Sequence, residues 1–114
     1  MAERRWRHYE TPTGRRPGKD FLDTLPDEDV AEIVAAMKEV REEGLRSARH
    51  LQGKVYEVRA DGPRGIYRIV FAPQGRSNQI LLVLAGFKKK TQKTPPQMIR
   101  LVQRRLRDWE RRGS

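Results

Sequence analysis

The sequence predicts an α+β fold, in which a twisted, mainly antiparallel sheet of about four strands has helices packed on one side. In two segments, apolar residues recur with the period of an amphipathic helix. In the segments between them, apolar residues alternate or run together over short stretches bounded by Gly, Pro and Asn. The resulting order is strand, helix, helix, three strands and a final helix, which is typical of a sheet covered by helices.

The N-terminal part predicts an edge strand over residues 4–10, followed by the turn sequence Thr11–Gly14. A single helical turn is expected over Asp20–Leu25. A stronger helix opens at Pro26, carries acidic residues in its first turn, where the helix dipole favours them, and ends at Gly44. One apolar stripe follows the 3.6-residue period of this helix, formed by Val30, Ile33, Val34, Met37 and Val40.

The C-terminal part predicts two alternating strands, Val55–Ala60 and Ile66–Ala72, and a third strand, Gln79–Phe87, that is apolar on both faces and therefore central. Thr94 is a candidate N-cap for a closing helix with Pro95 at its first position. The apolar face of this helix is formed by Met98, Ile99, Val102, Leu106 and Trp109. Its other face carries Arg100, Arg104, Arg105, Arg107 and Arg111, which we interpret as a solvated face without a catalytic role.

The 114 residues fit one domain, and their net charge of +10 predicts attraction to phosphate polymers. The charge is segregated along the chain. Residues 20–43 contain nine acidic and two basic residues, a net of −7, so the rest of the chain carries +17. A binding surface is therefore expected away from the long acidic helix.

Several chemistries are not expected from this sequence. There is no cysteine, the N-terminus has no signal-like apolar run, and the longest apolar run, Ile80–Gly86, is too short to span a bilayer. We therefore expect a cytoplasmic protein without a membrane partner. His8 and His50 lack metal-ligand spacing and no glycine-rich phosphate loop is present, so neither a metal nor a small-molecule cofactor is expected.

The phases of the strands predict a cluster of cations. Successive side chains of a strand point to opposite faces, so Glu57 and Arg59 share one face while Tyr56 points to the other. If the tyrosine-bearing faces pack on the helices, Arg59 and Arg68 emerge together on the uncovered face. The alternative is a solvated face on which Glu57 pairs with one of the arginines.

The third strand runs into Lys88, Lys89 and Lys90, near the two arginines. Arginine keeps its proton, so Arg59 and Arg68 are expected to clamp phosphate and to stabilise a transition state. A lysine among other cations can have a lowered pKa and act as acid or base. Glu57 could serve as the base, but an orienting role suits a carboxylate flanked by arginines better.

The residues also resemble a known family. Lys54–Arg59, Tyr67–Ile69 and Gly86–Pro95 look like successive signatures of the phage-derived, HigB-like branch of the RelE/HigB toxin superfamily, and Asp20–Pro26 resembles its helical opening. The similarity spans nearly the whole chain. One departure is Ala85, where many relatives have histidine; by strand phase Ala85 shares a face with Leu81 and Val83.

The resemblance implies a single RelE-like toxin domain over residues 1–114 that cuts mRNA, in many members only on the translating ribosome. It also implies a type II antitoxin as partner, often a helix-turn-helix DNA-binding protein. The implied catalytic residues are Arg68, Lys88, Lys89 and Lys90. The candidate RNA-binding residues are Arg59, Glu57, Tyr56, Phe87 and Lys93, and no metal is implied.

Two other functions remain open at this point. The chain could be a basic nucleic-acid-binding protein without catalysis, or an inactivated toxin relative that acts as a regulator. The toxin hypothesis predicts that Arg68→Ala removes growth inhibition while leaving the fold intact. Cleaved mRNA ends in a translating extract would separate the enzyme from a binding protein.

Overall fold

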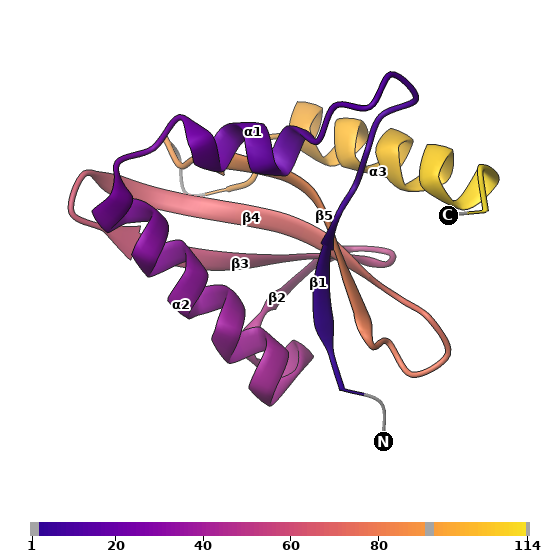
Figure 1. The fold of residues 1–114 in the computed structure, drawn as a ribbon, viewed down its shortest axis with the longest axis horizontal. Coiled ribbons are helices and arrows are strands. Elements are labelled where there is room, and N and C mark those ends of the chain that lie inside the picture. The colour runs from indigo at the N-terminus through magenta and orange to yellow at the C-terminus, as the bar shows by residue number, and fades with distance from the viewer. Residues whose placement is uncertain (1–2, 91–92, 114) are drawn as a thin grey trace.

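The computed structural model describes residues 3–90 and 93–113. It shows an open sheet with helices against it (Figure 1). The elements in chain order are β1 (Arg5–His8), α1 (Pro17–Asp23), α2 (Asp27–Glu43), the 3-10 turn η1 (Leu45–Ser47), β2 (Arg49–Gln52), β3 (Val55–Gly62), β4 (Gly65–Gln74), β5 (Ile80–Lys88) and α3 (Pro96–Arg111).

The sheet has five strands in the order β1-β5-β4-β3-β2. All neighbouring strands are antiparallel except β1 and β5, which run parallel. The predicted α+β class with a mainly antiparallel sheet is confirmed. The additional strand is β2, which has only Leu51 as an apolar residue and pairs irregularly with β3, so its sequence carries no strand period.

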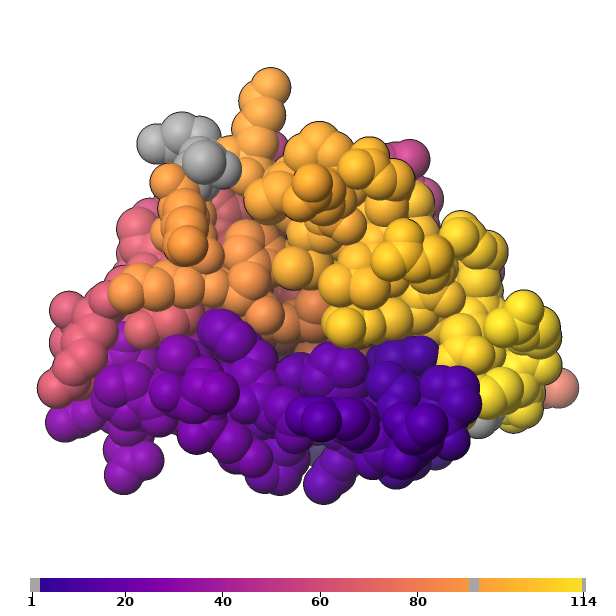
Figure 2. Space-filling view, turned by 90° about the horizontal axis from the view of Figure 1, so that it is seen from above, coloured from indigo at the N-terminus to yellow at the C-terminus, as the bar shows by residue number. Residues whose placement is uncertain are grey.

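The prediction that the helices pack on one side is wrong. Buried residues of α2 pack with Ile69, Phe71 and Val83 on one face of the sheet. Residues of α3 pack with Val70 and Leu82 on the opposite face. The figures show α1 and α2 on one side of the sheet and α3 on the other (Figures 1 and 2). The central strands are apolar on both faces, so both faces must be covered.

The long helix begins and ends where predicted, with Pro26 and Gly44 flanking it. Gly44 has φ +86°, a backbone conformation that favours glycine, and its N–H donates to the Val40 carbonyl. The predicted apolar stripe is confirmed for Ile33, Met37 and Val40, which are buried, but Val34 is 53% exposed.

A buried carboxylate attaches α2 to the hairpin that joins β3 and β4. Asp29 is fully buried and accepts hydrogen bonds from the Tyr67 hydroxyl and from the Arg64 N–H, the latter at 3.2 Å. Gly62 lies so close to Asp29 that a Cβ at this position would be 2.9 Å from the carboxylate. The first turn of α2 therefore fixes the position of the hairpin whose strands carry Arg59 and Arg68.

A β-bulge changes the phase of β5. Val70 pairs with Ala85 and Phe71 pairs with Val83, so Leu84 is an extra residue in the ladder. The prediction that Ala85 shares a face with Leu81 and Val83 is therefore wrong: Ala85 is buried on the α3 side of the sheet. The Leu84 carbonyl accepts a hydrogen bond of 2.7 Å from Arg105, so this member of the predicted arginine face points toward the sheet.

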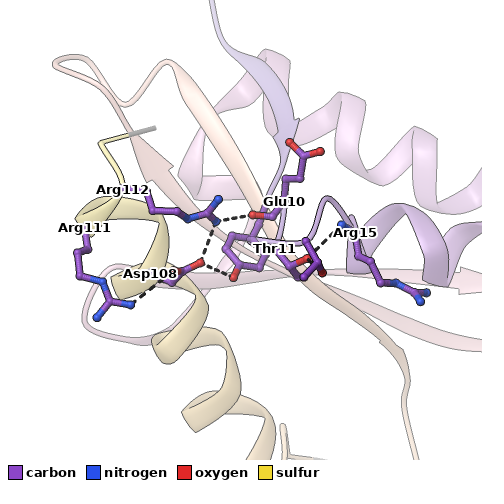
Figure 3. A network of polar contacts seen from close by, with 8 residues as sticks. Glu10, Thr11, Arg15, Asp108, Arg111 and Arg112 are labelled. Carbon is purple, nitrogen blue, oxygen red and sulfur yellow. Dashed lines mark hydrogen bonds and ion pairs between the residues drawn. The ribbon is translucent and has the colours of Figure 1, made fainter.

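Polar contacts join the end of α3 to the segment after β1 (Figure 3). The Tyr9 hydroxyl donates to Asp108 at 2.7 Å, and Arg112 donates to both Asp108 and the Glu10 carbonyl. The hydrogen bond from Tyr9 is the main cause of the lowered pKa of Asp108. These contacts fasten the C-terminal helix across the sheet edge.

We expect Tyr9→Phe to lower the free energy of unfolding at pH 7 by about 1–2 kcal/mol, because a hydrogen bond to a charged acceptor is lost. A carboxylate whose pKa is lowered by folding stabilises the fold above its ordinary pKa and loses that contribution as the pH falls through the folded pKa. The cost of Tyr9→Phe should therefore shrink in acid. Urea unfolding of the unaltered protein and of Tyr9→Phe, at pH 7 and at an acidic pH below the ordinary pKa of aspartate, measures this cost. Tyr56→Phe is the control, since no described residue hydrogen-bonds that hydroxyl; equal losses in both variants would contradict the assignment.

Candidate functional site

The two strand arginines lie side by side, as the strand phases predict. Arg59 of β3 pairs directly with Arg68 of β4 in the sheet register. Their exposures differ, however. Arg59 is exposed and its Nε donates to Asp61 at 2.9 Å, whereas Arg68 is only 5% exposed. The predicted open face is therefore wrong for Arg68, which is held inside the protein.

A buried carboxylate fixes Arg68. Glu57 is 1% exposed, and one of its oxygens accepts a hydrogen bond from Arg68 Nη1. Its other oxygen accepts a hydrogen bond of 2.5 Å from the Thr94 hydroxyl. Arg68 Nε is buried and has no hydrogen-bond partner among residues 3–90 and 93–113. Glu57 therefore holds the guanidinium in place, and within the described residues Nε has no acceptor.

Thr94 does not have the predicted capping role. The helix α3 begins at Pro96 and its N-cap residue is Pro95, without a side-chain cap. The Thr94 hydroxyl instead donates to Glu57, across 37 residues of sequence. Two consecutive prolines cannot supply backbone N–H donors, so a capping hydroxyl gains little here. Thr94 thus links the start of α3 to the buried ion pair.

Two further arginines lie near this pair. A groove of about 470 Å³ is bordered by the middle of β3, by α2 and by the segment from η1 to β2. It is lined by four arginines, Arg46, Arg49, Arg59 and Arg68. Arg49 lies 3.9 Å from Glu57, and Arg46 pairs with Glu43. The sequence did not single out Arg46 and Arg49 as site residues. Arg46 lies in η1 and Arg49 begins β2, and neither element has a clear apolar period.

The lysine triplet is divided between the two faces of the sheet. Lys88 pairs with Tyr67 in the register and lies over Gly65, where an added Cβ would be 2.5 Å from its side chain. Lys89 continues the strand, with its N–H donating to the Ile66 carbonyl. Lys90 is exposed. Lys88 and Lys89 therefore lie on different faces of the sheet.

The pKa of Lys89 is affected by the charges of the two strand arginines. Partial burial lowers its pKa, and the charges of Arg68 and Arg59 lower it further. Asp61 and Glu57 oppose this effect. The direction of this shift is the one expected for a lysine near other cations, although burial is its largest cause, and the role of Lys89 as acid or base stays a prediction.

The remaining candidates are spread around the site. Phe87 pairs with Arg68 in the register and is half-buried on the α3 side. Lys93 is exposed in the segment before Thr94, and Thr91 and Gln92 of the same predicted signature lie outside the described residues. Tyr56 points to the opposite face from Glu57, where it stacks on Phe71 at 6.0 Å between ring centroids. The structure therefore does not bring Tyr56 to the arginine pair.

No group of three metal-ligating side chains occurs in the described part of the chain. The His50 ring contacts the Gly53 carbonyl at 2.7 Å. Burial and the charges of Arg16 and Lys19 lower the pKa of His8.

None of the described helices is long and apolar enough to cross a membrane.

Fold and site together define a small basic α+β protein with an arginine-lined groove at one sheet edge. The profile of a family described as phage-derived protein Gp49-like (DUF891) matches residues 20–107. The match covers well over half of the chain, which therefore belongs to this family, a toxin-like part of the RelE/ParE-like toxin superfamily. Membership implies an antitoxin partner in general terms. A search among curated proteins finds no match.

Proposed function

We propose that this chain is the toxin of a type II toxin–antitoxin system, of the HigB-like branch, and that residues 1–114 form one toxin domain. It is a metal-independent endoribonuclease that cuts translated mRNA at the ribosome in the cytoplasm. A cognate antitoxin of the helix-turn-helix type neutralises it. The observation that supports this proposal most is the fixed guanidinium of Arg68 beside Lys89, a lysine whose pKa is lowered.

The reaction uses the 2′-hydroxyl of RNA as nucleophile. The 2′-hydroxyl loses its proton to solvent water as its oxygen attacks the adjacent phosphorus, and the bond to the 5′-oxygen breaks. The departing 5′-oxygen takes up a proton, so the products are a 2′,3′-cyclic phosphate and a 5′-hydroxyl. Charge that builds on the phosphoryl oxygens is stabilised by cations already in position. Arg68 suits this role because Glu57 holds it, so little reorganisation is needed when RNA binds.

Lys89 is assigned the proton transfer to the departing 5′-oxygen. A lysine with a lowered pKa gives up its proton more readily than an ordinary lysine, which brings it closer to the range where acid catalysis is efficient. Arg46, Arg49 and Arg59 bind the phosphates that flank the cut. Phe87 and Lys93 contact the RNA beside these arginines. Lys88 has a supporting role only, because it lies on the face of Tyr67, and Lys90 is assigned a supporting role as an exposed cation.

The proposal is tested by mapping mRNA ends in a translating extract with and without the protein. We expect new 5′-hydroxyl ends that need both the protein and the ribosome, and growth inhibition when the chain is expressed without an antitoxin. Cleavage that is equally fast on free RNA would contradict ribosome dependence. Absence of any cleavage would contradict the enzyme.

The burial of Arg68 favours a second candidate function, a nucleic-acid-binding protein without catalysis. The guanidinium is 5% exposed and its charge is compensated by Glu57. In such a protein, the exposed cations of the groove bind RNA and Arg68 is structural. RNA binding without cleavage in the translating extract would favour this function, including that of an inactivated toxin relative.

We expect the pKa of Lys89, measured by NMR titration of lysine labelled at Cε, to lie below the ordinary value of 10.5. Arg59→Gln should raise it, because removal of a nearby positive charge favours the protonated amine. Arg15→Gln is the control, since Arg15 pairs with Asp20 on α1, across the sheet. A Lys89 pKa that does not move in Arg59→Gln would contradict the electrostatic link between these residues.

A further inference from the structure

The outer face of α3 is a row of four exposed arginines. Arg100, Arg104, Arg107 and Arg111 are spaced by three or four residues, so they form one stripe opposite the buried Val102 and Leu106. With a rise of 1.5 Å per residue, the stripe is about 16 Å long. Like charges at these spacings destabilise a helix, so the stripe does not help α3 to form.

The acidic residues of α3 leave most of the stripe uncompensated. Asp108 is bonded to Tyr9 and Arg112 and reaches only Arg111 of the stripe, at 3.5 Å (Figure 3). Glu110 pairs with Lys54. In the described part of the chain, neither a hydrogen bond nor an ion pair holds Arg100, Arg104 or Arg107. Three guanidinium groups thus remain available to a partner.

The stripe begins beside the candidate site. The helix α3 starts at Pro96, two residues after Thr94, whose hydroxyl donates to Glu57 of the buried ion pair. It covers the sheet face to which Glu57, Arg59 and Arg68 belong, and it lies along the outside of the molecule (Figure 2). Arg100 is the member of the stripe nearest to Thr94 along the chain, and the other three follow toward the end of α3.

We infer that the arginine stripe of α3 binds the backbone of the same RNA strand that occupies the site, on one side of the cut. The inference rests on the proposed function for its ligand and adds a second contact surface to it. Arginine binds phosphate through several donors in fixed geometry, and a row along a straight helix contacts successive phosphates without reading bases. The stripe therefore increases the affinity for RNA and sets the path of the RNA strand along α3, without a preference for particular bases.

The test measures binding of uncleavable 2′-O-methyl RNA by fluorescence anisotropy, with oligonucleotides of about 4 and about 16 nucleotides, the span of known single-strand binding sites. The variant replaces all four stripe arginines by glutamine. A matched control removes the same charge from α1, its preceding loop and α2 by replacing Arg15, Lys19, Lys38 and Arg41 with glutamine. Circular dichroism checks that each variant is folded.

For the long RNA, we expect the stripe variant to lose about tenfold or more in affinity. Its dependence of log K on log salt should become shallower by up to about 3, since each phosphate contact to a single strand contributes about 0.7. The stripe variant should bind the short RNA with the same affinity as the unaltered protein does. The control variant should bind both RNAs with nearly the affinity of the unaltered protein.

Three results would overturn the inference: unchanged affinity of the stripe variant for the long RNA, an equal loss in the control variant, or an equal loss with the short RNA. The first would point to another ligand for the stripe, such as an acidic antitoxin segment, and the second to net charge alone. Because binding is measured without cleavage, failure of the nuclease proposal is seen separately, in the translating extract.

Discussion

Arg68→Ala is expected to abolish growth inhibition and also to destabilise the fold by about 3–5 kcal/mol. Glu57 is 1% exposed, and removal of its cationic partner would leave a buried carboxylate without compensation. The structure thus corrects the expectation from the sequence that this variant leaves the fold intact. Urea unfolding and growth curves after induction measure the two effects. Stability equal to that of the unaltered protein would contradict the energetic role of the pair.

A double variant separates activity from stability. Replacing Glu57 by leucine together with Arg68 by methionine removes both buried charges, and such replacements of a buried ion pair are often neutral or stabilising. We expect this variant to recover most of the stability lost in Arg68→Ala and to remain non-toxic. Toxicity like that of the unaltered protein would show that Arg68 has no role in the reaction.

Lys89→Met is expected to slow mRNA cleavage by about 10²–10⁴-fold, the usual contribution of a positioned acid or base. Methionine preserves much of the side-chain length, and Lys89 lies just beyond the end of β5 with a half-exposed side chain, so the fold should persist. Single-turnover cleavage of mRNA on programmed ribosomes measures the effect. Circular dichroism shows whether the variant is folded.

Lys88→Met is the matched control for Lys89→Met. The two residues are adjacent in sequence and chemically identical, but Lys88 lies on the face of Tyr67 and over Gly65. Its replacement should slow cleavage by less than about tenfold, because a group outside the reacting geometry contributes little to proton transfer. Equal losses at the two positions would contradict the assignment of proton transfer to Lys89.

Local periodicity was sufficient to predict much of the fold. The α+β class, the long helix from Pro26 to Gly44 and the two alternating strands of the hairpin follow from repeats of 3.6 and 2 residues. The same alternation predicted that Arg59 and Arg68 would lie side by side, because the short turn between β3 and β4 leaves their register little freedom. Clustering of these cations is thus a property of the sequence.

Only the tertiary structure decided how this cluster is built. The strand β2 has no apolar alternation and forms by pairing with β3, so the groove arginines Arg46 and Arg49 gave no strong local signal. The bulge at Leu84 reverses the phase of β5, and strand counting cannot detect an extra residue in a ladder. The burial of Arg68 against Glu57, the hydrogen bond from Thr94 to Glu57 and the covering of that face by α3 depend on contacts between residues distant in sequence. Residue types and local periods determined which cations are present and which share a strand face, whereas long-range packing determined which is buried, which is exposed and which has its pKa lowered.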